Sequence, residues 1–174
     1  MDYIFHYDSP IGGITLGSDG DALTGLLFDG EKYFDNTFDG HCKVTVVSAQ
    51  NIDSFPVFAE TVRWLDIYFS GKDPGFLPPL KIVATSFCRE VCEIMLTIPY
   101  GKTMSYGQIA AVLAKRRGIK KMAAQAVGGA VGHNPISLII PCHRVIGTDG
   151  SLTGYGGGLD KKVYLLRLEG VRCE

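Results

Sequence analysis

A segment rich in chain-breaking residues, 73–79, limits what this chain can fold into. It reads Asp-Pro-Gly-Phe-Leu-Pro-Pro, and neither a helix nor a central strand continues through so many prolines. The charge changes sign at the same place: residues 1–80 carry 12 acidic and 4 basic side chains, whereas residues 81–174 carry 6 and 13. A chain of 174 residues can form two small domains. We place their boundary between about residues 75 and 84, which gives domains 1–80 and 81–174.

The segments before this boundary predict a small antiparallel sheet followed by a helix. Short apolar runs lie at residues 3–7, 14–16 and 23–28. Stretches containing Gly, Asp, Ser and Pro separate them, which is typical of strands joined by turns. Ser54-Phe55-Pro56 then opens an apolar pattern of helical period that runs to Phe69 and that Gly71 ends. The first domain therefore contains both strands and a helix.

The segments after the boundary predict a mostly helical domain. Four helices are expected, beginning near residues 86, 105, 122 and 160. Ser86 and Asp160 are the predicted caps of the first and the last, and Ser105 with Gln108 fits a capping box at the start of the second. Together the two halves indicate an α+β fold: a small antiparallel sheet with a helix, followed by a mostly helical domain.

The second and third of these helices are joined by a basic loop, residues 115–121. No acidic residue occurs between Glu93 and Asp149, where seven basic residues fall: Lys102, Lys115, Arg116, Arg117, Lys120, Lys121 and Arg144. Such a stretch is typical of a phosphate-binding surface, although a solvated face also gathers like charges. Two short helices around a basic turn fit either a DNA-binding helix-turn-helix or a plain helical hairpin in a core.

The cysteines and the N-terminus indicate a cytoplasmic protein. Five cysteines at irregular spacing, an odd number, argue against a disulfide framework. Residues 1–8 lack the basic region and apolar core of a signal peptide, and no apolar run approaches the roughly 20 residues that cross a bilayer. Cys88 and Cys92 stand four residues apart and could seed a metal site or a disulfide, but small buried helix residues are the better interpretation.

The hexapeptide Ile140–Val145, with sequence Ile-Pro-Cys-His-Arg-Val, places a thiol beside an imidazole at the end of an apolar run. A cysteine is a good nucleophile only as the thiolate, and a nearby imidazole lowers its pKa. Asn134 upstream and Glu169 downstream supply the other polar groups that an activated thiol would use. We therefore favour Cys142 as a nucleophile over the alternative of a buried structural thiol.

This hexapeptide resembles the active-site signature of the O6-alkylguanine-DNA alkyltransferases, as do residues 128–135 before it and Gly154-Tyr155 after it. The resemblance implies a ribonuclease-H-like N-terminal domain and a C-terminal domain with a DNA-binding helix-turn-helix. It also implies a single-turnover DNA repair enzyme that moves the alkyl group of O6-alkylguanine, and of O4-alkylthymine in some cases, irreversibly to Cys142. No cofactor and no metal are expected.

The resemblance also implies roles around the thiol. His143 would take the thiol proton through water, Glu169 would orient and charge-stabilise the imidazole, and Asn134 would hold the turn around the site. This is the logic of a triad, in which a nucleophile is paired with a base and the base with an acid. Tyr106 corresponds to the tyrosine that donates a proton to the departing guanine.

Further residues would bind the substrate and the DNA. The backbone amides near Val145 and Gly156 would face the O6 atom, and Tyr155 would wall the pocket around a base turned out of the duplex. Gln125 stands where relatives often carry an arginine that fills the gap left by this base. We also place Arg144 among the DNA-binding residues. The small residues at 123–130 suit close approach to the minor groove of double-stranded DNA.

Two other functions fit parts of the sequence. A non-catalytic protein that binds alkylated lesions would keep the helical basic half, but the presence of Cys142 argues against it. A cysteine-dependent hydrolase would use Cys142 and His143, but it leaves the basic helices and the glycines at 154–158 without a purpose. We expect a monomer without membrane association.

Overall fold

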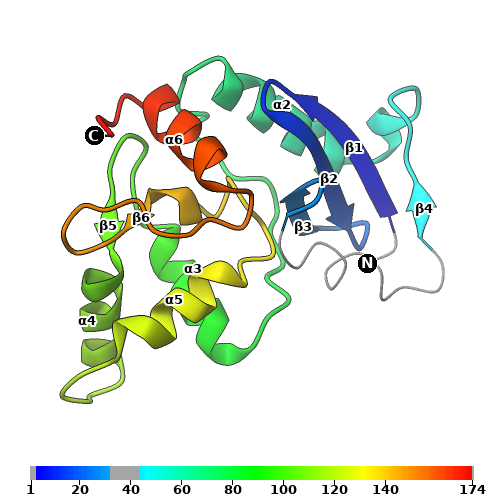
Figure 1. Ribbon diagram of the computed structural model, residues 1–174. Helices are drawn as coiled ribbons and strands as arrows, with labels where there is room; N and C mark the ends of the chain where they lie inside the picture. Colours follow the sequence, from blue (N-terminus) through cyan, green and yellow to red (C-terminus); the bar gives the residue numbers. More distant parts are fainter. Residues whose placement is uncertain (1–2, 32–43, 174) are drawn as a thin grey trace. The chain divides into compact units, whose positions relative to one another are not determined.

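The computed structural model describes residues 3–31 and 44–173 (Figure 1). Cys42, one of the five cysteines, lies outside these ranges. The described residues form two compact units. The N-terminal unit runs up to Val83 and includes Pro135–Ser137, and the C-terminal unit comprises Ala84–Asn134 and the residues from Leu138 onward.

The N-terminal unit is built on a four-stranded sheet. Its strands are β1 (Tyr3–Ser9), β2 (Gly12–Ser18), β3 (Leu23–Phe28) and β4 (Thr45–Val46). They lie in the order β3-β2-β1-β4, with β1 antiparallel to β2, β2 antiparallel to β3, and the short β4 parallel to β1. The three predicted strands are thereby confirmed, and β4 is an addition.

The helix of this unit, α2 (Pro56–Phe69), follows a single 3-10 turn, η1 (Ile52–Ser54), and packs on strands β1 to β3. Pro56 occupies its first turn, where a missing N–H costs nothing because no partner exists there. The side chains of Phe58, Leu65 and Tyr68 are fully buried. The helix predicted from the apolar pattern is confirmed, and its buried stripe forms the core of the unit.

The outer edge of β3 is covered by two short segments. Leu80 bridges to Leu23, and Ile136 bridges to Leu26. The Leu26 N–H donates to the Pro135 carbonyl at 2.9 Å, and the Ser137 N–H donates to the Leu26 carbonyl at 2.7 Å. Residues 135–137 fall in the second predicted domain, whereas the structure packs them in the N-terminal unit, because they satisfy this exposed strand edge.

The C-terminal unit is mostly helical. Its elements are α3 (Ser86–Met95), β5 (Met104–Ser105), α4 (Tyr106–Arg116), α5 (Ala124–Gly132), η2 (Cys142–Arg144), β6 (Val145–Ile146) and α6 (Leu159–Leu168). Helices α3, α4 and α5 pack on one another, and Figure 1 shows α4 and α5 as consecutive short helices. The four predicted helices and the α+β fold class are confirmed.

One predicted cap is confirmed and two are wrong. The Ser105 hydroxyl accepts from the Gln108 N–H at 3.1 Å and the Gln108 side chain accepts from the Ser105 N–H at 2.7 Å, which is a full capping box. Thr85, not Ser86, caps α3, because its hydroxyl reaches the Cys88 N–H. Gly158, not Asp160, precedes α6, since its φ of +94° admits a turn that other residues avoid.

Two features bear on the expectations about membranes and disulfides. Within residues 3–31 and 44–173, no helix is both long enough and apolar enough to span a bilayer. Cys88 and Cys92 lie on α3 and form no disulfide with each other. Burial raises the pKa of the Cys92 thiol to about 12, so this cysteine is a poor nucleophile at neutral pH.

Candidate active site

A two-residue parallel ladder organises the site in the C-terminal unit. Met104 pairs with Val145, and Ser105 pairs with Ile146, which joins β5 to β6. Helix α4 begins directly after β5, and the 3-10 turn η2, which carries the predicted nucleophile, ends directly before β6. The ladder therefore brings the start of α4, with Tyr106, beside the loop that holds Cys142.

The side chain of Glu169 is the polar centre of the site. Its Oε1 lies 2.7 Å from Nε2 of His143, and both side chains are fully buried. Burial raises the pKa of Glu169, but hydrogen bonds and charge from His143 and Arg144 outweigh this and hold the pKa at about 2. Glu169 is therefore a carboxylate throughout the physiological range. The structure brings these two predicted residues together, as an imidazole–carboxylate pair.

Arg144 completes this buried cluster. Its Nε donates to Glu169 Oε2 at 2.9 Å, its Nη2 donates to Glu169 Oε1 at 3.1 Å, and its Nη1 donates to the Ile98 carbonyl at 2.7 Å. The guanidinium also lies 5.7 Å from the ring centroid of Tyr100. Arg144 is a predicted DNA-binding residue, but the structure buries it against Glu169, because a buried carboxylate needs a compensating charge.

A glycine makes room for the carboxylate. The Gly101 N–H donates to Glu169 Oε2 at 3.0 Å. Its φ is +70°, and a Cβ on this residue would lie 2.9 Å from the Glu169 carbonyl oxygen. Both the backbone conformation and the close approach favour glycine here. The Glu169 carboxylate thus accepts hydrogen bonds from two segments that are distant in sequence, one with Gly101 and one with His143 and Arg144.

His143 is held as a neutral imidazole. Burial lowers its pKa below the ordinary value of 6.5, and the charge of Arg144 adds to this, while the hydrogen bond to Glu169 works in the opposite direction. Because Arg144 already neutralises Glu169, a second positive charge would be costly in this buried cluster. Nε2 points at the carboxylate and therefore carries the hydrogen, which leaves the Nδ1 lone pair as the basic position of the ring.

Asn134 braces the loop that leads to Cys142. Its Nδ2 donates to the Ile140 carbonyl at 2.8 Å, and both groups are buried. The Cys142 N–H donates to the same carbonyl at 2.8 Å. Cys142 itself is 6% exposed. This loop therefore presents a nearly covered sulfur, which suits attack on a group that enters a pocket rather than one in bulk solvent.

Lys162 is a residue of the site that was not predicted from the sequence. Its side chain is fully buried, and Nζ donates to the carbonyls of Val145 at 2.6 Å and Thr153 at 2.9 Å. Burial lowers its pKa to about 8. Helical spacing was the available signal, since Lys162 shares one face of α6 with Leu165, Leu166 and Glu169. Its ammonium fastens the loop after β6 to the strand that follows Cys142.

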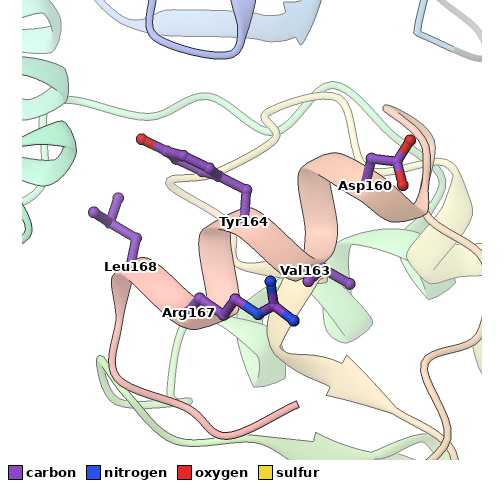
Figure 2. A pocket seen from close by; sticks show the side chains of 5 residues that line it. All are labelled: Asp160, Val163, Tyr164, Arg167 and Leu168. Carbon is purple, nitrogen blue, oxygen red and sulfur yellow. The ribbon is translucent and has the colours of Figure 1, made fainter. Parts of the chain in front are cut away.

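The opposite face of α6 lines a pocket of its own. Figure 2 shows the five side chains that line it: Asp160, Val163, Tyr164, Arg167 and Leu168. These positions recur every three to four residues and so lie on one side of the helix. Cys142 is not among them. This pocket is therefore separate from the thiol, and we assign it no part in the chemistry.

The remaining predicted residues occupy the helices and the loop around the site. Tyr106 is half-buried in the first turn of α4, with its ring 3.8 Å from the position that a Cβ on Gly128 of α5 would take. Gln125 is exposed in the first turn of α5. Val145 is buried, whereas Tyr155 and Gly156 are half-buried in the loop that Lys162 fastens.

The basic stretch divides into structural and exposed groups. Arg117 pairs with Glu90 through two hydrogen bonds of 3.1 and 2.8 Å, and it lies 5.2 Å from the ring centroid of Phe87, so it ties the α4–α5 loop to α3. Three exposed lysines, Lys115, Lys120 and Lys121, line a pocket between α4 and α5. The loop thus presents positive charge beside the two helices.

Two family descriptions match the chain almost from end to end. Residues 3–82 match "6-O-methylguanine DNA methyltransferase, ribonuclease-like domain", and residues 86–171 match "6-O-methylguanine DNA methyltransferase, DNA binding domain". The methylated-DNA–protein-cysteine methyltransferase of Mycobacterium leprae is 42% identical, with 93% of this chain and 88% of the relative covered. That of Methanosarcina acetivorans is 41% identical, with 97% and 98% covered.

Solved structures of this family are also similar to the chain. The O6-methylguanine methyltransferase of Mycobacterium tuberculosis is 41% identical with a TM-score of 0.78, over 97% of this chain and 93% of that one. The crystal structure of Mycobacterium tuberculosis OGT in complex with DNA gives 39% identity and a TM-score of 0.77, over 96% and 92% of the two chains. The similarity therefore covers both units.

Proposed function

The chain belongs to the 6-O-methylguanine DNA methyltransferase family, and we propose that Cys142 is the residue that accepts the alkyl group. The protein is a DNA repair methyltransferase that transfers the group to its own cysteine. The observation that supports Cys142 is the imidazole next to it in sequence, which Glu169 holds at 2.7 Å and which burial keeps neutral.

The transfer is a displacement at the alkyl carbon. His143 accepts the thiol proton at Nδ1, through a water molecule as the family resemblance implies, and the imidazolium formed is stabilised by Glu169. The sulfur of Cys142 then forms a bond to the alkyl carbon as the bond from that carbon to O6 breaks. The electron pair passes to guanine, which takes a proton from the Tyr106 hydroxyl. The thioether is stable, so each protein reacts once and needs no cofactor.

The neighbouring residues position these groups. The amides near Val145 and Gly156 face the O6 atom, and Tyr155 walls the pocket for the base. Lys162 supports this arrangement because it holds the Val145 carbonyl and the loop that leads to Tyr155. Arg144 acts through Glu169 and does not contact DNA.

The DNA is bound by α4 and α5, which act as a helix-turn-helix in the minor groove. Small residues along α5 permit close backbone approach, and the exposed lysines Lys115, Lys120 and Lys121 contact phosphates. The target base is turned out of the duplex, and Gln125 occupies the gap that it leaves. We infer that one monomer acts on each lesion and that the protein works in the cytoplasm.

A duplex with a single O6-methylguanine tests this proposal. We expect the DNA to regain unmodified guanine after incubation with the wild-type protein, and Cys142→Ala to abolish the repair while it still binds the duplex. Cys92→Ala is the matched control, because this second buried thiol should leave repair unchanged. Retained lesion binding without any repair by the wild-type protein would identify a non-catalytic lesion-binding protein instead. Repeated turnover would point to a hydrolase.

A further inference from the structure

A buried carboxylate of the N-terminal unit, Glu31, holds the segment that leads to the nucleophile. The Glu31 side chain is 7% exposed. Its Oε2 accepts from the Phe28 N–H at 3.0 Å, and its Oε1 accepts from the Ser137 hydroxyl at 2.8 Å. Glu31 follows the end of β3, and Ser137 belongs to the segment that covers the β3 edge. The bond between them therefore lies within the N-terminal unit.

The residue after Ser137 has a strained backbone. Leu138 has a φ of +68° and is, among the described residues, the only non-glycine with a positive φ. A branched side chain in this region is unfavourable, and such a conformation persists only where the surroundings fix it. Leu138 is fully buried. Its conformation turns the chain between the edge segment and the loop that carries Cys142.

Anchors on both sides fix this turn. Before it, Ser137 is held through its hydroxyl by Glu31 and through its N–H by Leu26. After it, the Ile140 carbonyl accepts from Asn134 and from the Cys142 N–H. Loss of the first anchor would let Leu138 relax to a common backbone conformation. The loop would then change direction before it reaches Cys142.

We propose that Glu31 is a positioning residue for the alkyl transfer: by fixing Ser137 it keeps Leu138 in its left-handed conformation and so sets the place of the Cys142 sulfur. The proposal rests on the proposed function of Cys142. It concerns geometry only, since Glu31 exchanges no proton with the substrate. Small misplacement of a nucleophile is costly, because an in-line displacement requires close alignment of the reacting atoms.

The experiment is a single-turnover measurement with an O6-methylguanine duplex on wild type, Glu31→Ala, Glu31→Gln and Ser137→Ala. Glu31→Ala should slow transfer roughly tenfold or more at saturating DNA, with the affinity for the duplex unchanged. Glu31→Gln should restore the rate to within about threefold, because an amide oxygen can accept from Phe28 while its NH₂ donates to the Ser137 hydroxyl. The transfer rate of Ser137→Ala should lie between the rates of these two variants.

The control is Asp19→Ala, which removes the exposed ion pair of Asp19 with Lys81 in the same unit, 2.8 Å long, and should leave the rate unchanged. Amide hydrogen exchange gives a second readout. In Glu31→Ala and Ser137→Ala, exchange should rise at the Cys142 amide but not in the β1–β2 pairing. If Glu31→Ala does not fold, the transfer rates and the amide hydrogen exchange of Ser137→Ala and Glu31→Gln still test the proposal.

Three results would overturn the proposal: a wild-type rate in Glu31→Ala, equal slowing in Glu31→Ala and the Asp19→Ala control, or a fall in DNA affinity that accounts for the whole loss of rate. A wild-type protein that transfers no methyl group would contradict the proposed function instead. In that case hydrogen exchange at Cys142 would still decide whether Glu31 holds this loop.

Discussion

The charge state of His143 depends on two buried neighbours, Glu169 and Arg144. An imidazole next to a carboxylate usually has a raised pKa, and such a histidine would be protonated and unable to act as a base at mildly acid pH. Here the guanidinium of Arg144 neutralises the carboxylate through hydrogen bonds from its Nε and Nη2, and burial then lowers the pKa of His143. The cluster thus keeps the base ready for the thiol proton.

This charge state predicts the pH dependence of the reaction. The rate should stay within about twofold as pH falls from about 7.5 to 6.5, the ordinary pKa of histidine, because the folded pKa of His143 lies lower and the ring stays neutral. The rate should decline only at more acid pH. Single-turnover rates across this range would check it. A midpoint at or above pH 6.5 would mean that burial does not lower the pKa of His143.

Arg144→Met should move the midpoint of this pH dependence to higher pH. Without the guanidinium, the full charge of Glu169 acts on His143 and raises its pKa, so the decline in rate should begin at higher pH than in wild type. The variant should also lose about 3–5 kcal/mol of stability, because one partner of a buried ion pair is left alone. Arg117→Met is the matched control, since it breaks an exposed Arg–Glu pair. A midpoint that does not move would contradict the neutralising role.

Side-chain direction explains what the sequence could not reveal about these residues. The Cys-His pair and the distant Glu169 were identified as candidates from residue type and resemblance, and the structure brings His143 and Glu169 together. Arg144 looked like a phosphate ligand because it is basic and adjacent to Cys142. Its burial depends on Ile98, Tyr100 and Glu169, and no local pattern predicts a contact that joins three distant segments.

At the scale of elements, helix α6 supports the site with one face only. Lys162 and Glu169 lie on the buried face, two turns apart, and hold the Val145 backbone and the His143 ring. The face that Figure 2 shows, with Tyr164 and Arg167, lines a separate pocket whose lining includes neither Val145 nor His143. Substitutions on the buried face should therefore lower activity, whereas substitutions on the other face should leave it unchanged.

Lys162→Met should impair transfer, whereas Arg167→Met should not. Methionine fills a similar volume but donates no hydrogen bond, so the carbonyls of Val145 and Thr153 lose a buried partner. We expect a loss of about 1–3 kcal/mol in stability and a transfer rate lowered by roughly tenfold or more. Thermal unfolding and single-turnover kinetics measure both. Equal transfer rates in Lys162→Met and Arg167→Met would show that the hydrogen bonds of Lys162 are dispensable.

Helix α5 carries a second element-level prediction. Gln125 is exposed in its first turn, where an uncharged amide can hydrogen-bond an orphaned base but adds no attraction to phosphates. Gln125→Arg should therefore strengthen binding to duplex DNA and raise the repair rate several-fold, and the gain in binding should shrink as salt increases. Gln125→Met serves as a control without charge. An unchanged or lower repair rate in the arginine variant would refute this.

Element boundaries show where sequence patterns are weakest. Strands, helices and the capping box at Ser105 follow from local periodicity and local hydrogen bonds, and these predictions are confirmed. Ser86 and Asp160 fit the preferred residue types for a cap, yet Thr85 and Gly158 take that place. Adjacent residues of suitable type compete for a cap, and the backbone around each decides the outcome.

In the whole molecule, the charge reversal and the chain breakers at 73–79 indicate two halves. One short segment from the second half of the sequence nevertheless packs in the N-terminal unit. Pro135–Ser137 packs in the N-terminal unit through the edge of β3. The apolar pattern around it is compatible with either unit. Only the pairing with Leu26 and the buried bond to Glu31 distinguish them, and both depend on tertiary contacts.

Intact-mass spectrometry after incubation with an O6-methylguanine duplex is the most direct test of whether Cys142 accepts the methyl group. We expect the protein to gain the mass of one methyl group and no more, peptide mapping to place the group on Cys142, and Cys142→Ala to gain nothing. A methyl group mapped to another residue, or an unchanged mass together with tight binding to the lesion, would contradict it.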